Sequence, residues 1–269
     1  MNEELSYAYA VVRPTPDLAE GPVPGVTGVA SGAVRVVGAG ALAAAVGSVP
    51  RSDFSEAALK VRLEDLDWLE RVARAHHGVV EALAARTTVL PLRLATVYVD
   101  DDRVRDVLRR GEETFTRMLD RLTGHVEWGV KVYAEVPRAP AAPAADDAGA
   151  SDPGRAYLRR RRQQREERGT AWSEAAEAVR RIEAEAGEIA VRLARHRPQQ
   201  GRLAVGTGEN VANDAYLVPG ERSEEFRDRV RRSTRDLRGV RVEITGPWAP
   251  YSFAVLTEEP EAPGEVGGP

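Results

Sequence analysis

The stretch GVRVEITGPWAPYSFAVL, residues 239–256, contains the last strand of the predicted fold and its sharpest corner. Its first part alternates β-branched and charged residues, which is the period of a half-buried strand. A Gly-Pro pair then breaks the run, and residues 251–255 are predicted to resume the strand. Because proline cannot donate a ladder hydrogen bond, the corner cannot lie in mid-sheet. Trp248 therefore serves either as a plug for the core or as a partner contact, and the sequence leaves both open.

Upstream of this corner, the sequence predicts a complete second domain. The stretch VEWGVKVYAEV, residues 126–136, has the pattern of a strand, and a long helical pattern covers residues 155–195. Further strands are predicted at 203–206 and 214–218, and a helix at 223–237. The resulting order, β-α-β-β-α-β, is that of ferredoxin-like folds. The long helix carries a heptad-like apolar seam that would face a sheet or a partner helix: Trp172, Ala175, Val179, Ile182, Ala186, Ile189 and Leu193.

The first half of the chain predicts a separate mixed α/β domain. A strand is expected at 5–12, short strand-like pieces at 25–30 and 33–37, and a strand pair around Pro91. Helical periodicity over 63–83 places Leu66, Leu69, Ala73, His76, Val80 and Leu83 on one apolar face. A second helix is predicted to begin at the aspartates 100–102 and to end at Gly124.

These patterns predict an α+β protein with two domains, residues 1–124 and 125–256. A proline- and alanine-rich loop near 137–153 and an acidic tail at 257–269 are expected to be disordered, because both are poor in apolar residues.

Composition excludes several classes of protein. The chain of 269 residues has no cysteine, which rules out disulfides and thiol catalysis. Its net charge of −4 provides no overall attraction to nucleic acid or to anionic lipid. The longest uncharged run, residues 36–50, is shorter than the roughly 18 apolar residues that a membrane span needs. The acidic start of the chain is not a secretion signal, and we expect a cytoplasmic protein that does not enter a membrane.

One motif raises an enzymatic alternative. Gly38, Gly40 and Ala43 match the glycine fingerprint of dinucleotide sites, which would make the chain a nucleotide-dependent enzyme. That chemistry needs a helix starting near Gly40, whereas Gly47 and Pro50 would stop such a helix within about two turns. A tight turn is the favoured interpretation.

No metal site, cofactor site or catalytic residue is predicted. Asp100, Asp101 and Asp102 could bind a hard cation, but aspartates at a helix start also cap backbone amides. His76 and His77 are adjacent, so they cannot chelate one ion from ideal helical positions. Neither a nucleophile elbow nor a Walker loop occurs.

The strongest charge run is a candidate partner contact. Arg159, Arg160, Arg161 and Arg162 lie within a stretch of seven arginines and two glutamates on the long helix. Such a run is most often a solvated helix face, and otherwise it fits an acidic protein. An RNA-binding module would also need an Arg/Lys-Gly-aromatic strand, which is missing here.

Six segments together resemble the gas vesicle protein GvpF/GvpL family. They follow the order of the family and span almost the whole chain. Two features depart from the family pattern: Ala95 stands where members often have glycine, and the 137–153 loop is rich in alanine and proline. The segments are YAYAVV at 7–12, VLPLRLATVY at 89–98, VEWGVKVY at 126–133, GRAYLRRRR at 154–162, NDAYLV at 213–218 and ITGPWAPYSF at 244–253.

The resemblance implies a minor structural or assembly protein of gas vesicles, the gas-filled buoyancy organelles of the cytoplasm. Its implied partners are the small hydrophobic major shell protein and other gas vesicle accessory proteins, and self-association stays open. No catalytic residue, cofactor or metal is implied. Trp248 and Arg159–Arg162 are the residues we expect to contact a partner.

Overall fold

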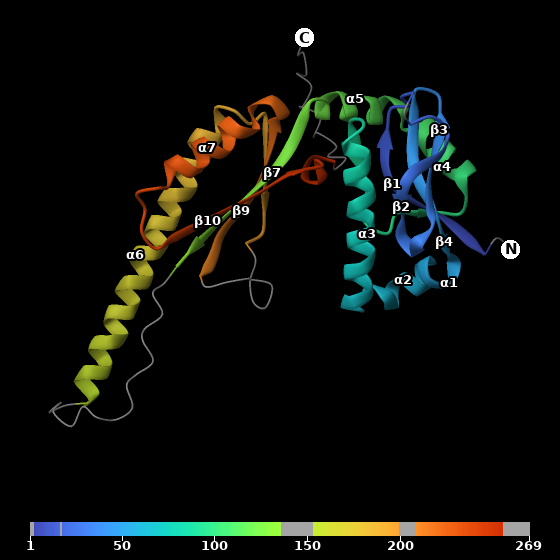
Figure 1. Ribbon diagram of the computed structural model, residues 1–269. Coiled ribbons are helices and arrows are strands. Elements are labelled where there is room, and N and C mark those ends of the chain that lie inside the picture. The colour runs from blue at the N-terminus through green and yellow to red at the C-terminus, as the bar shows by residue number, and fades with distance from the viewer. Residues whose placement is uncertain (1–2, 17, 136–152, 199–207, 255–269) are drawn as a thin grey trace, which may run out of the picture. The chain divides into compact units, whose positions relative to one another are not determined.

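The computed structural model describes residues 3–16, 18–135, 153–198 and 208–254, without the side chains of 153–157 and 160. The chain forms two compact units (Figure 1). The first contains Met1–Leu122 together with Pro250–Pro269, and the second contains Thr123–Ala249. The chain therefore passes from one unit to the other twice. The first crossing lies close to the predicted boundary at 124/125, but Pro250–Ala254, expected in the second domain, belongs to the first unit.

The first unit is built on an antiparallel sheet of six strands in the order β2-β3-β4-β1-β5, with β6 also pairing with β1. The central strand β1 has neighbours on both sides, which is why it is buried from Leu5 to Val12. The strands are β1 (Glu4–Val12), β2 (Gly21–Thr27), β3 (Ala33–Ala39), β4 (Leu42–Pro50), β5 (Val89–Pro91) and β6 (Val97–Tyr98).

Helices pack against this sheet and complete the first unit. The long helix α3 contacts β1, β2 and β5, whereas α4 contacts β3, β4 and β6. The helices are α1 (Arg51–Phe54), α2 (Glu56–Arg62), α3 (Leu66–Ala84), α4 (Asp101–Arg110) and α5 (Glu112–Leu122), with short 3-10 turns at Val29–Ser31 and Tyr251–Phe253.

Two predictions for the helices of the first unit are wrong in detail. Leu66, placed on the apolar face, is 76% exposed, because the buried face is rotated toward Trp68, Val72, His76, Val79, Val80 and Leu83. The predicted helix after Asp100 is two helices, which separate at Gly111. A side chain at Gly111 would collide with the Phe115 ring, 2.6 Å from the Cβ position.

The second unit is a four-stranded antiparallel sheet in the order β10-β7-β9-β8. Its core forms where α6 and α7 lie against the sheet, with Trp128, Val130 and Val132 of the strands packing against Ile182 and Phe226 of the helices. The elements are β7 (His125–Ala134), α6 (Pro153–Gly187), β8 (Arg192–His196), β9 (Glu209–Pro219), a 3-10 turn (Gly220–Arg222), α7 (Ser223–Ser233) and β10 (Val240–Trp248).

The helix α6 differs from its prediction in two ways. It ends at Gly187 rather than near 195, and the residues that follow form β8. Its buried face is also rotated: Ala171 and Ala178 face the core, whereas Trp172 is 37% exposed. Alanines fill this face because their small side chains let the helix backbone approach the sheet closely.

Four further predictions concern later parts of the chain. The strand expected at 251–255 is wrong, since Tyr251–Phe253 forms a 3-10 turn. The strand expected at 203–206 and the tail at 257–269 lie outside the described residues, as does nearly all of the loop at 137–153.

Candidate functional site

The glycine motif of the first unit forms a hairpin. Gly38 belongs to β3, Gly40 occupies the turn with a φ of 65°, and Ala43 belongs to β4. Ala39 pairs with Leu42, so only two residues connect the strands. A phosphate site of the dinucleotide type requires a helix start at this point, and a strand stands there instead. The tight-turn interpretation is confirmed.

The three aspartates at the start of α4 have partners within the protein. The Asp100 carboxylate caps the helix by accepting from the Arg103 N–H at 2.8 Å. Asp101 accepts from Arg35 at 2.7 Å and from the Ser6 hydroxyl at 2.6 Å. These contacts lower the pKa of Asp101 although its partial burial acts in the opposite direction. Within the described residues, no group of three His, Asp or Glu side chains could hold a metal ion.

His76 belongs to a buried aromatic cluster of the first unit. The Tyr7 hydroxyl accepts from the Ala95 N–H at 3.0 Å and lies 3.0 Å from His76 Nδ1, to which it can donate. Burial lowers the pKa of His76 to about 4, and the backbone of Leu92 offsets only part of that shift. His76 is therefore neutral at pH 7 and acts as a hydrogen-bonded core residue.

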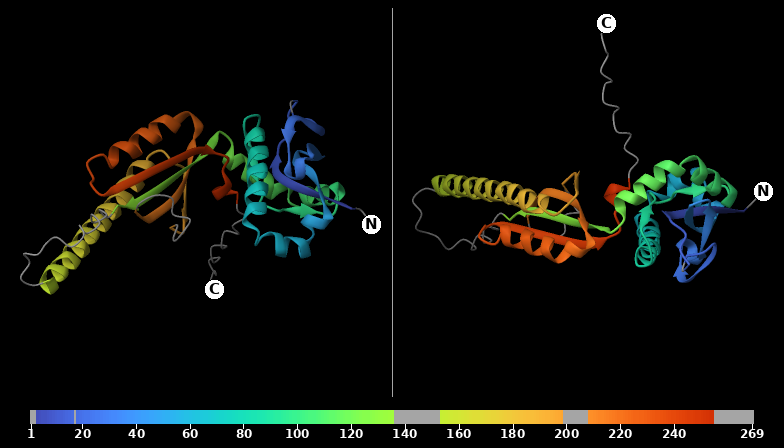
Figure 2. Two further views of the ribbon diagram at one scale, coloured as in Figure 1. Left: turned by 60° about the horizontal axis from the view of Figure 1, so that its bottom comes forward. Right: turned by 90° about the horizontal axis from the view of Figure 1, so that it is seen from above.

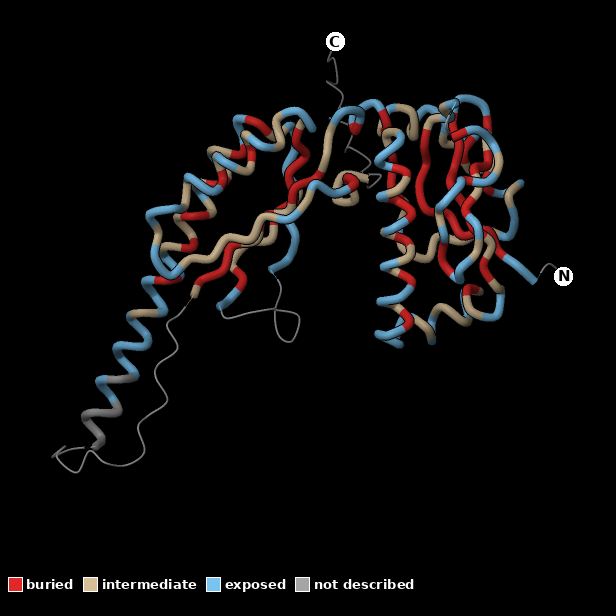
Figure 3. Tube along the Cα trace, viewed as in Figure 1, coloured by how far each residue is buried: buried red, intermediate tan, exposed pale blue. Residues whose placement is uncertain are grey.

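The arginine run lies on the first half of α6, which continues past the sheet of the second unit (Figures 2 and 3). Arg159, Arg161 and Arg162 are exposed, and the side chain of Arg160 is not described. Arg162 pairs with Glu166 at 3.1 Å, so part of this charge is used within the helix. The first half of α6, which we call the basic arm, nevertheless presents a basic face that no described core residue covers.

Trp248 ends β10 and is 38% exposed. It follows a shift of register in the β10–β7 pairing and the Gly246–Pro247 peptide, which is cis. A side chain with this exposure is partly packed and partly available to a partner. This exposure is compatible with both roles that the sequence left open for Trp248, a core plug and a partner contact. Trp248 is far from the arginine run in the sequence of the second unit.

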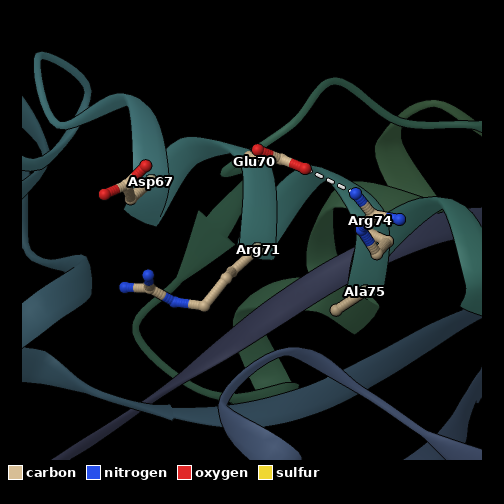
Figure 4. A pocket seen from close by; sticks show the side chains of 5 residues that line it. All are labelled: Asp67, Glu70, Arg71, Arg74 and Ala75. Carbon is tan, nitrogen blue, oxygen red and sulfur yellow. Dashed lines mark hydrogen bonds and ion pairs between the residues drawn. The ribbon is translucent and has the colours of Figure 1, made fainter.

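An exposed apolar corner in the first unit was missed by the sequence argument. Val61, Leu63 and Leu66, at the junction of α2 and α3, are 71%, 45% and 76% exposed. Beside it on α3, Asp67, Glu70, Arg71, Arg74 and Ala75 line an open hollow of about 490 Å³ (Figure 4). Since the described residues that line this hollow all belong to α3, it is a charged helix face more than an enclosed site. Of the three, Leu66 alone belongs to α3, and it lies off the buried face of that helix.

The sequence profile of the gas vesicle synthesis protein GvpL/GvpF family matches residues 5–255. The chain belongs to this family. Gas vesicle protein L of Streptomyces sp. (strain CB03234) is 48% identical over 96% of this chain and 95% of that protein. Gas vesicle protein F of the same strain is 28% identical over 82% and 87% of the two chains.

Solved structures of GvpF share the fold of this GvpL/GvpF family member. The crystal structure from Anabaena sp. PCC7120 superposes with a TM-score of 0.65 at 17% identity, covering 94% of this chain and 97% of that one. The structure from Microcystis aeruginosa gives a TM-score of 0.62 at 17% identity, with 94% and 99% covered. Among the described residues, no helix is long and apolar enough to cross a lipid bilayer.

Proposed function

We propose that this GvpL/GvpF family member is a non-catalytic structural or assembly protein of gas vesicles, located in the cytoplasm and on the vesicle. In this proposal it contacts the small hydrophobic major shell protein while vesicles form, together with other gas vesicle accessory proteins. Neither nucleic acid nor a membrane is a partner, and self-association stays open. The two units act as two domains, and the strand order β10-β7-β9-β8 supports a ferredoxin-like second domain.

The observation that carries the shell contact is the apolar corner of Val61, Leu63 and Leu66. A hydrophobic shell subunit that is not yet assembled exposes apolar surface to water and aggregates through it. An accessory protein must therefore cover some of that surface. Three large aliphatic side chains with exposures of 45–76% on one helix junction can supply such a cover. Two further contacts are proposed. The basic arm of α6 suits an acidic surface, and Trp248 suits a surface that binds an aromatic ring.

The test is capture of the purified major shell protein by the full chain. A double variant, Leu63→Glu with Leu66→Glu, should lose most of the captured shell protein, because it places two charges in the apolar contact. Val99→Glu is the matched control: Val99 is 52% exposed in the same unit but lies away from the corner in sequence. If the double variant captures as much as the unchanged chain, the corner is not the contact.

The second contacts are separated in the same assay. Arg159→Glu with Arg162→Glu should lower capture only if the shell protein presents acidic groups. Trp248→Ala should lower capture with little loss of stability, since more than a third of its side chain is already exposed. Immunoblotting of purified vesicles tests the vesicle role itself, and absence of the protein from vesicles and from assembly intermediates would refute it.

A further inference from the structure

Among the described residues, the strand β10 leaves one edge of the second-unit sheet open, because it pairs with β7 on its other side and with no further described strand. The Glu135 N–H donates to the Gly239 carbonyl at 2.8 Å, so the polar backbone groups of Gly239 point toward β7. This direction alternates along an antiparallel strand. Val240, Val242 and Ile244 therefore point their N–H and C=O groups away from β7, and we call these three residues the β10 edge.

A groove runs along the β10 edge. The side chains of Val240, Val242 and Ile244 are half-buried, and with Arg231 and Thr234 they line a hollow of about 430 Å³. The hollow lies between the strand and α7, on the face that carries the core. Within the described residues, no hydrogen bond reaches the outward backbone groups of these three residues. The edge thus combines open backbone groups with an apolar floor.

One arginine lines the groove, and two more follow it closely in the sequence. Arg231 lies in the last turn of α7, and Arg235 and Arg238 lie in the segment that leads into β10. All three are exposed and form no ion pair with another described residue. The nearby Asp236 carboxylate is occupied by Arg181 at 2.9 Å. The rim therefore attracts carboxylates.

The opposite edge of the same sheet is protected. The strand β8 has the sequence RLARH, and its Arg195 pairs with Glu183 at 2.8 Å. Charged side chains on a short edge strand oppose the addition of another strand. The β10 edge instead carries half-buried β-branched side chains beside the groove, which favour pairing with an extended chain.

We propose that the β10 edge binds an extended segment of a partner protein as an added strand, with aliphatic side chains at alternate positions and carboxylates at its ends. The backbone groups of the segment pair with those of Val240, Val242 and Ile244, and its aliphatic side chains enter the groove. Its carboxylates meet the rim arginines. A second copy pairing through the same edge would bring its own arginines against these, so charge selects an acidic partner. This inference is independent of the apolar corner and of the shell protein.

Fluorescence anisotropy with the full chain tests the proposal. The probe is a labelled peptide, Glu-Glu-Val-Thr-Val-Thr-Val-Glu-Glu, blocked at both ends. We expect saturable binding that weakens by about tenfold at high salt, because the rim charges are screened. The same peptide with lysine in place of glutamate should not bind. Absence of saturable binding of the glutamate peptide overturns the proposal.

Variants identify the edge. Val242→Pro removes an outward N–H while the β7 ladder stays intact, and it should weaken binding by about tenfold or more. Arg231→Glu with Arg235→Glu should do the same. Arg192→Glu, an equal change per site at the β8 edge, should leave binding unchanged. If Arg192→Glu abolishes binding and Val242→Pro does not, the strand adds to β8 and the proposal is wrong.

A change on the peptide keeps the test valid if Val242→Pro fails to fold. Methylating alternate backbone nitrogens of the probe removes its ladder donors without touching the protein. The set of methyl groups that faces the β10 edge should abolish binding, and the other set should not. Equal binding by both methylated peptides would show that no strand is added.

Discussion

The two units fill their cores with different side chains. In the first unit, Tyr7, Tyr9, Phe54, Trp68 and His76 form a cluster with ring centroids 4.8–5.7 Å apart. In the second unit, the core face of α6 is mostly alanine, and the bulk comes from the strands and from α7. The first core therefore depends on rings with polar tips, and the second depends on close approach of a helix to a sheet.

The stability of the first unit depends on the hydrogen bonds that the hydroxyl groups of its buried tyrosines make. The Tyr9 hydroxyl accepts from the Val29 N–H at 2.8 Å, and the Tyr7 hydroxyl joins Ala95 to His76. A buried polar group without a partner costs about 1–3 kcal/mol, so the loss of any one of these contacts destabilises the first unit. The stability of the second unit depends instead on the volume of its core side chains, because a close-packed interface tolerates neither a cavity nor an added methylene.

The largest expected effect is a cavity in the second unit. Phe226 is fully buried and packs its ring 5.4 Å from that of Tyr216. Phe226→Ala should lower the free energy of unfolding of the second unit by about 3–5 kcal/mol. Chemical denaturation that follows the two units by separate tryptophans would show it. An equal loss in the first unit would mean that the cores are not independent.

The next effect is a pH dependence confined to the first unit. Because burial lowers the pKa of His76 to about 4, its neutral form stabilises the folded unit above pH 6.5. That stability is lost as the pH falls from 6.5 toward 4, by about 3 kcal/mol, since only the unfolded chain takes up the proton readily. Unfolding free energies measured across this range should show the loss.

A pair of adjacent histidines supplies the control. His76→Gln should remove this part of the pH dependence, whereas His77→Gln should keep it, because His77 is only half-buried and faces Glu81 at 3.3 Å. If His76→Gln keeps the full dependence, another group of the unit is responsible.

Overpacking is expected to have a smaller effect, in the second unit. Ala178 is fully buried on the core face of α6, so Ala178→Leu forces the helix away from the sheet and should cost about 1–3 kcal/mol. Ala184→Leu, on the exposed face of the same helix, should change the thermal midpoint little. Equal midpoints for the two variants would contradict the close approach of α6.

The smallest effect is a gain in the first unit. Ala95 has a φ of 61°, in the left-handed region that favours glycine, and its N–H is held by the Tyr7 hydroxyl. Ala95→Gly should stabilise the unit by about 0.5–1 kcal/mol, because relief of the backbone outweighs the added freedom of the unfolded chain. Ala85→Gly, at a helix end with a φ of −67°, should instead destabilise it. Destabilisation by Ala95→Gly would show that the Ala95 methyl group contributes packing.

Strong local patterns predicted much of this fold. The alternating run at 5–12, the helical run before Ala84 and the strand at 126–136 became β1, α3 and β7. Periodicity sufficed there because each element meets its core along a single face. The turn at Gly40 was also predictable, since two glycines and a nearby proline leave no room for a helix.

For the candidate site, the sequence could indicate residues by their type but not whether they are exposed. Trp248 and the arginines stand out by composition, whereas the apolar corner at Leu63 and Leu66 is hidden among residues that resemble core. The free edge of β10 could not be read at all, because a strand becomes an edge only when the order of the sheet is known. Exposure is a property of the packed molecule.

By itself, the sequence of this protein determined its family, its α+β class and the type of its most regular elements, because these follow from local periodicity and from motifs of short range. The tertiary structure decided which face of each helix is buried, where α6 ends and where Pro250–Ala254 packs. The polar run Arg192–His196 is a strand because β9 supplies its hydrogen bonds, and Tyr251 leaves the second unit because its ring lies 6.3 Å from that of His76. Such choices depend on partners that are distant in the chain, whose contacts outweigh the weak preferences of a few residues.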